Sequence, residues 1–102
     1  MAQFDVFRNA RSRRYPLVID LQADLLQDLA THVVAPLTPL GRLAGTPISR
    51  LNPVVTVDGT ECAILFQELA AYPVQRVGPA VANFQSARVE LIAALDLLST
   101  GV

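Results

Sequence analysis

The segment PVVTVDGTECAILF, residues 53–66, is the clearest local indication of the fold. Its dipeptide Asp58-Gly59 lies between two runs rich in apolar and β-branched residues, 54–57 and 60–66. Aspartate and glycine accept the positive φ angles that a two-residue hairpin turn requires. We therefore predict an antiparallel β-hairpin here.

Outward from the hairpin, four more segments have the composition of strands: 3–8, 15–22, 32–37 and 73–77. The second is expected to be the more deeply buried, because its centre is a continuous run of β-branched residues and leucine. In the third, Pro36 lacks an N–H group and favours an edge strand or a bulge. Glycine and proline interrupt residues 38–53, which are expected to be mostly irregular.

The long helix is predicted near the end of the chain, from residue 83 or 86 to residue 98. Nine of the twelve residues 87–98 are apolar, and the exceptions are Arg88, Glu90 and Asp96. At about 100° per residue, Glu90 lies about 200° and Asp96 about 80° around the axis from Arg88, so no clean polar face remains. We expect the helix to be covered on two sides, by its own sheet and by a second copy of the chain. The order of elements predicts one antiparallel α+β domain, residues 1–102, with a C-terminal helix.

Composition limits the classes of function. Apolar residues make up 52% of the chain and charged residues 17%, which indicates that part of the surface meets a partner. The net charge of -1 gives no general attraction to nucleic acid or an anionic membrane, and no transmembrane span is expected. With a lone Cys62, an internal disulfide is impossible, and one cysteine and one histidine cannot build a zinc site. The expected compartment is the cytoplasm.

Sequence motifs of catalysis are not found, so we expect no catalytic residue, metal or cofactor. The plain acid–base candidates are His32 with Asp20 or Asp24, and nothing in their spacing brings them together. His32 is interpreted as a strand-end residue satisfied by the backbone, and Cys62 as a small buried hydrophobe.

Two segments are candidates for binding. Residues 23–31 form an expected loop whose Leu25 and Leu26 are either core residues or exposed anchors for a partner. Four of the arginines cluster between the first two predicted strands: Arg8, Arg11, Arg13 and Arg14. This cluster is interpreted as a solvated loop, as a clamp for an acidic peptide or as a phosphate-binding site. Of the two binding interpretations, the acidic peptide is favoured, because arginine pairs bidentately with carboxylates.

Several blocks in order resemble the CcdB family of toxins, the gyrase poisons of CcdA–CcdB toxin–antitoxin modules. They are MAQFDVF, the arginine-rich loop, YPLVIDLQADLL, VVAPL, LNPVVTVDG, YPVQRVG and a helix ending in ALDLLSTGV. The resemblance implies a small SH3-like antiparallel β-barrel with an additional short sheet and a long C-terminal helix, as in MazF-type toxins. It also implies a homodimer whose two helices meet near the two-fold axis.

The resemblance further implies inhibition by binding rather than catalysis. Such dimers bind the GyrA subunit of DNA gyrase and trap the enzyme with its DNA cleaved, and a CcdA-like antitoxin neutralises them. Contact with DNA would arise only indirectly, through the antitoxin complex, and no membrane is involved. The gyrase-binding positions carried over are Ala23, Leu25, Leu26, Asp96, Thr100, Gly101 and Val102, with Gln3 and Phe4 contributing from the first strand. The arginine cluster would bind the antitoxin.

The sequence departs from the familiar family pattern in two places. The usual ending Trp-Gly-Ile is Thr100-Gly101-Val102 here, and Asp96 stands where asparagine is usual. Two alternatives therefore stay open: a homologue that binds antitoxin without poisoning gyrase, and a MazF-like endoribonuclease on the same fold.

Overall fold

The computed structural model describes residues 2–9, 15–43 and 45–101. The strands are β1 (Asp5–Arg8), β2 (Leu17–Asp20), β3 (Thr31–Pro39), β4 (Val54–Val57), β5 (Thr60–Ile64), β6 (Ala70–Pro73) and β7 (Ala82–Asn83). Short 3-10 turns are η1 (Asp24–Leu26), η2 (Leu40–Arg42), η3 (Phe66–Glu68), η4 (Val74–Arg76) and η5 (Gln85–Ala87), and the α-helix is α1 (Arg88–Thr100). The predicted α+β class is confirmed.

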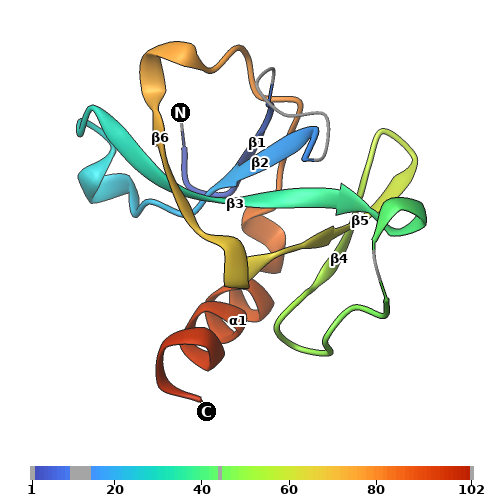
Figure 1. Ribbon diagram of the computed structural model, residues 1–102. Helices are drawn as coiled ribbons and strands as arrows, with labels where there is room; N and C mark the ends of the chain where they lie inside the picture. Colours follow the sequence, from blue (N-terminus) through green and yellow to red (C-terminus); the bar gives the residue numbers. More distant parts are fainter. Residues whose placement is uncertain (1, 10–14, 44, 102) are drawn as a thin grey trace.

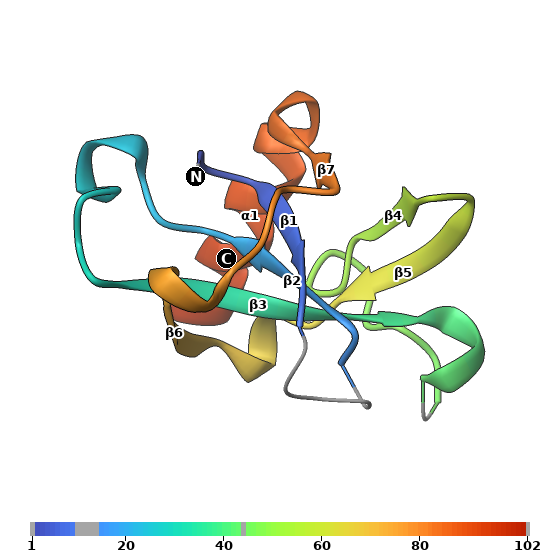
Figure 2. The same cartoon turned by 90° about the horizontal axis from the view of Figure 1, so that it is seen from above.

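The strands form a nearly closed, barrel-shaped antiparallel sheet with α1 packed against it (Figure 1). The strand order is β4-β5-β3-β2-β1-β7, and β6 pairs with β3 beside β5. The long strand β3 runs through the middle, with β2 along one edge and β5 and β6 sharing the other (Figure 2).

Pro36 lies in this central strand, so the expected edge position is wrong. Its carbonyl accepts the N–H of Leu65 at 2.9 Å, on the edge that β5 and β6 share. In an antiparallel strand the N–H and C=O of one residue point to the same side. Pro36 falls between the pairs Val34↔Ala70 and Leu37↔Ile64, where the chain passes from β5 to β6. The missing N–H therefore interrupts no ladder.

The hairpin predicted at Asp58-Gly59 is confirmed. Val57 pairs with Thr60, and the two turn residues have φ angles of 50° and 79°. Two successive positive φ angles are typical of the type I′ turn, whose twist matches that of the strands.

The strand predicted at 73–77 is wrong. The strand in this region is β6, which ends at Pro73, and η4 follows it. Pro73 pairs with Thr31, the first residue of β3, and Val74 donates its N–H to the carbonyl of Ala30. Because the partner strand begins only at Thr31, residues beyond Val74 have no strand to pair with.

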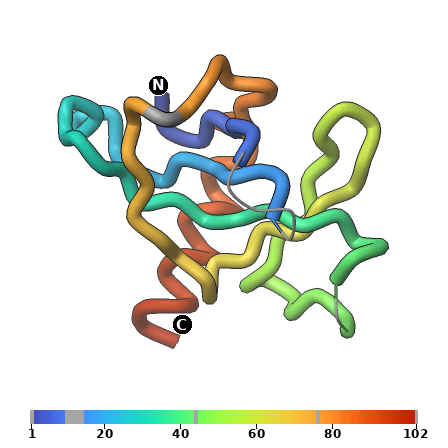
Figure 3. The backbone as a smooth tube through the Cα atoms, turned by 45° about the horizontal axis from the view of Figure 1, so that its top comes forward, coloured from blue at the N-terminus to red at the C-terminus, as the bar shows by residue number. Residues whose placement is uncertain are grey.

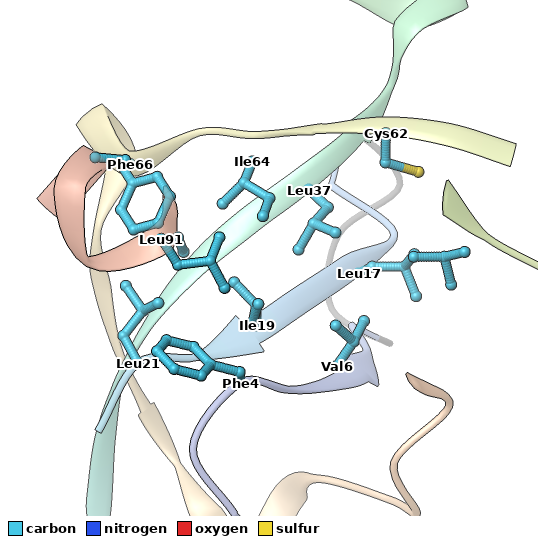
Figure 4. Close-up of a cluster of buried hydrophobic side chains, with 13 residues drawn as sticks. Phe4, Val6, Leu17, Ile19, Leu21, Leu37, Cys62, Ile64, Phe66 and Leu91 are labelled. Atoms are coloured by element: carbon cyan, nitrogen blue, oxygen red, sulfur yellow. The ribbon is translucent and has the colours of Figure 1, made fainter. Parts of the chain in front are cut away.

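Both faces of the sheet carry buried side chains. The larger cluster of buried side chains lies between the sheet and α1, which contributes Leu91 and Ala94 (Figure 4). A smaller cluster on the opposite face consists of Phe7, Val18, Val34 and Tyr72. All residues of β2 are buried: Leu17 and Ile19 enter the larger cluster and Val18 enters the smaller one, as the apolar run predicts, while Asp20 is buried outside both.

The helix ends as a left-handed cap. Gly101 has a φ angle of 78°, and its N–H donates to the carbonyl of Leu97 at 2.9 Å. Val89, on the side of the helix away from the sheet, is 79% exposed, and Leu98, one turn beyond the buried Ala94 on the same stripe of the helix, is 39% exposed. These apolar side chains are open in a single chain, and their coverage by a second copy stays a prediction.

In the described part of the chain, no helix has the length and apolarity needed to cross a membrane.

Candidate protein-binding site

The chain leaves β2 at Leu21 and turns back to β3 through residues 22–31, and Leu25 and Leu26 lie at the turn. The turn forms because Leu26 donates its N–H to the carbonyl of Ala23 at 2.8 Å, and Gln27 donates to the carbonyl of Asp24 at 3.2 Å. Leu25 is 92% and Leu26 is 48% exposed. Of the two interpretations of these leucines, the exposed one is confirmed. Residues 23–26 are called the leucine turn below.

The N-terminal segment supports the leucine turn. Gln3 donates its backbone N–H to Oδ1 of Asp24 at 2.9 Å, and its side-chain amide donates to the carbonyl of Leu21 at 3.3 Å. Arg88, at the start of α1, donates from Nη1 to Oε1 of Gln3 at 2.8 Å. Gln3 therefore lies beside the leucine turn, as the resemblance implies.

Phe4 does not lie on this surface. Its side chain is 1% exposed and points into the main core beside Leu21 (Figure 4). The backbone has a φ angle of 69°, which turns the ring inward, and the guanidinium carbon of Arg88 lies 6.0 Å from the ring centroid. The expectation that Phe4 contributes a surface contact is corrected accordingly: its side chain stabilises the fold.

The second group of candidate residues lies at the end of α1. Asp96, Thr100 and Gly101 are exposed, and Val102 lies outside the described residues. The hydroxyl of Thr100 donates to the carbonyl of Asp96 at 2.7 Å, which satisfies one carbonyl of the last turn. Asp96, Thr100 and Gly101 are called the helix end below.

A single chain does not bring the two groups together. In Figures 1 and 3 the cyan leucine turn and the red helix end lie on separate sides of the molecule. A partner that touches both groups must therefore be large, or must contact different copies of the chain.

Of the arginine cluster, the structure describes Arg8, while Arg11, Arg13 and Arg14 lie outside the described residues. Nη2 of Arg8 lies 3.8 Å from Oδ2 of Asp58 in the hairpin turn, and the two side chains are 72% and 71% exposed. An ion pair at that distance and exposure contributes little to stability. The Arg8 guanidinium is consequently accessible to another carboxylate.

His32 and Asp20 form a buried pair that the sequence did not predict. Nδ1 of His32 lies 2.7 Å from Oδ2 of Asp20, and Nε2 lies 2.9 Å from the carbonyl oxygen of Gln27. The side chains are 1% and 0% exposed. The expected backbone partner is present, but the expectation that nothing joins His32 to Asp20 is wrong. Asp20 pairs with Val34, so His32 is its diagonal neighbour on the same face of the sheet.

Buried groups of this kind cannot reach a substrate. The sole histidine of the sequence is enclosed with Asp20, and burial raises the pKa of the Cys62 thiol, so the thiolate is disfavoured. The interpretation of Cys62 as a small buried side chain is confirmed. Among residues 2–9, 15–43 and 45–101, no three His, Cys, Asp or Glu side chains gather as metal ligands would.

One further surface has no signal in the sequence. An open groove of about 680 Å³ lies between β4 and the first turns of α1. Apolar residues dominate its lining, among them Val54, Val55 and Val89, with Arg50 and Glu90 also present. It extends the apolar side of α1 that the sheet does not cover.

Two comparisons with known proteins agree with this architecture. The family model described as CcdB protein matches residues 3–101, nearly the whole chain. The solved structure of Mycobacterium tuberculosis toxin MazF-mt6 is similar in fold, with a TM-score of 0.69, 16% sequence identity and coverage of 93% of each chain. At this identity the likeness concerns the fold, and it confirms the predicted CcdB/MazF-like barrel.

Proposed function

This chain belongs to the CcdB family and is a toxin of a toxin–antitoxin module, and we propose that it acts by binding the GyrA subunit of DNA gyrase and trapping the enzyme with its DNA cleaved. Family membership supports the toxin class. Gyrase as the target, the homodimer and the neutralising CcdA-like antitoxin are part of the proposal.

The observation that carries the proposal is the exposure of Leu25. A leucine that is 92% exposed at the tip of a hydrogen-bonded turn contributes almost nothing to the core of its own chain. Asp24 and Asp28 flank the two leucines, and both acidic residues are exposed. An apolar centre with a charged border is the usual arrangement of a protein-binding surface.

The gyrase surface in this proposal consists of two parts. Ala23, Leu25 and Leu26 form the first, with Gln3 beside them, and Asp96, Thr100, Gly101 and Val102 form the second. Thr100 offers less apolar area than the tryptophan usual in the family, so the leucine turn contributes a larger share of the binding free energy. A homodimer presents both parts twice, which suits a dimeric partner.

The antitoxin surface in this proposal includes Arg8, Arg11, Arg13 and Arg14. The exposed contact between Arg8 and Asp58 at 3.8 Å is weak, so a carboxylate of an acidic peptide can replace Asp58 there. We expect Arg8→Ala to weaken antitoxin binding and to reduce its salt dependence, as measured by calorimetry at two ionic strengths. Unchanged affinity and salt dependence would remove Arg8 from the antitoxin surface.

Binding is favoured over ribonuclease chemistry by the position of the one histidine. A general base must come within hydrogen-bonding reach of the proton that it removes. His32 is 1% exposed and already has Asp20 and the Gln27 carbonyl as partners. It therefore cannot serve an RNA substrate without unfolding of the strand that carries it.

The test is a gyrase cleavage assay with the purified protein, supercoiled DNA and ATP. We expect linear DNA to accumulate after detergent and protease treatment, and addition of the antitoxin to reverse the accumulation. A variant that lacks Gly101 and Val102 should trap less complex. If the full chain traps none but still binds antitoxin, the non-poisoning alternative holds. RNA cleavage with intact DNA would instead establish the ribonuclease.

A further inference from the structure

The segment that presents the leucine turn has no buried anchor of its own. Between Leu21 and His32, both buried, every side chain of residues 22–31 is exposed or half-buried. The burial of apolar side chains therefore does little to offset the backbone entropy that is lost when residues 22–31 become ordered. Hydrogen bonds have to hold it.

Most of these hydrogen bonds are local or come from accessible side chains. Gln27 donates from its side chain to the carbonyl of Gln22 at 2.8 Å, and the Gln22 amide donates to the carbonyl of Leu26 at a long 3.4 Å. Asp24 accepts from the N-terminal segment through an exposed contact. Water competes for the exposed groups among them, so these contribute little on their own.

The contact of His32 with the segment is different because the imidazole that makes it is 1% exposed and packed inside the fold. Nε2 faces the backbone carbonyl oxygen of Gln27, which can only accept a hydrogen bond. This nitrogen therefore carries a hydrogen atom and donates the hydrogen bond. Nδ1 faces the Asp20 carboxyl group at 2.7 Å. The other oxygen of Asp20 accepts the N–H of Gln22 at 2.8 Å. One buried pair thus holds the segment at Gln22, where it leaves the sheet, and at Gln27, just after the turn.

We propose that His32 is the positioning residue of the leucine turn: with Asp20 it fixes the segment from inside the fold and thereby keeps Leu25 and Leu26 in the conformation that binds a partner. This inference rests on the proposed function for the identity of the partner. The ordering of the leucine turn by His32 does not depend on the proposed function, and it can be measured on the free protein.

The chain offers a matched pair of variants. Phenylalanine in His32→Phe keeps a buried ring but leaves the Gln27 carbonyl and the Asp20 carboxylate without their partner. Asparagine in Asp20→Asn keeps the network, because its oxygen accepts from Gln22 and its amide donates to Nδ1 of a neutral imidazole. A residue with a merely structural role would affect the whole fold in proportion to lost stability, whereas a positioning residue affects residues 22–31 selectively.

Amide hydrogen exchange on the full chain separates these cases. In His32→Phe we expect exchange at Leu26, Gln27 and Leu29 to speed up by about tenfold or more, since a buried unpaired polar group is costly. Ile64 and Leu65, whose N–H groups bond to Pro53 and Pro36, serve as controls and should not change. Asp20→Asn should stay within about threefold of the unmodified chain, since it keeps neutral hydrogen bonds. Uniform acceleration in His32→Phe, or none in the segment, overturns the proposal.

Binding of purified GyrA then tests the consequence. We expect His32→Phe to bind GyrA at least about tenfold more weakly than the unmodified chain, and Asp20→Asn to retain most of the affinity. If the unmodified chain does not bind GyrA, the proposed function fails and the exchange data alone decide the role of His32. If His32→Phe does not fold, nitrogen NMR of the imidazole in the unmodified chain decides, because an unprotonated Nε2 refutes the bond to Gln27.

Discussion

Replacing Leu25 with alanine should separate binding from stability more sharply than any other substitution in this chain. The side chain is 92% exposed and belongs to neither buried cluster. Truncation therefore removes almost no packing, and the free energy of unfolding should change by less than about 0.5 kcal/mol. In the proposed complex the same side chain is buried against GyrA, so its whole apolar area contributes to the binding free energy.

The magnitude follows from the carbons removed. Leucine exceeds alanine by three carbon atoms, and at about 0.8 kcal/mol for each buried methylene the loss is about 2.4 kcal/mol. Since about 1.4 kcal/mol corresponds to a tenfold change in affinity, the dissociation constant should rise about 50-fold.

The assay is calorimetric titration of GyrA with the two proteins, together with chemical denaturation of each. Ile48→Ala is a control, because Ile48 is 54% exposed and belongs to the segment between η2 and β4. Figure 1 shows this segment on the opposite side of the molecule from the leucine turn. It should change neither affinity nor stability. If Leu25→Ala binds as tightly as the unmodified chain, the leucine turn is not the gyrase surface.

Three further substitutions and conditions test the fold. Leu91→Ala, at 1% exposure between helix and sheet, should destabilise the chain by about 2–5 kcal/mol in a denaturant titration at fixed protein concentration. Gly59→Ala places a side chain at a φ angle of 79° and should cost about 1 kcal/mol by the same measurement. Burial raises the pKa of Cys62, so stability that is present below the ordinary thiol pKa should decline as pH rises through and above that value, and Cys62→Ala should lack this decline. A thiol reagent should accordingly label Cys62 much faster in denaturant than in buffer.

Some features were predictable because they depend on neighbouring residues. The hairpin follows from Asp58-Gly59, whose backbone preference is local. The burial of β2 follows from its continuous apolar run. The family resemblance added the barrel and the binding role, which no single local pattern indicates.

Other features were not predictable because they depend on pairing between distant segments. The gap between β5 and β6 lets Pro36 occupy a central strand, and the first residue of β3 decides where β6 ends. The family resemblance implied a surface contact for Phe4, but the backbone there has a positive φ angle and the ring lies in the core. The spacing of residues in the sequence does not predict these features.

The sequence by itself determined the hairpin, the C-terminal helix and the class of the fold, because periodicity and turn chemistry act within a few residues, whereas the exposure of Leu25 and Leu26 had two interpretations until the structure showed it. Only the tertiary structure decided that His32 meets Asp20 at 2.7 Å beneath the leucine turn. That contact exists because β2 and β3 pair in one register, and a shift by a single residue would turn the two side chains to opposite faces of the sheet.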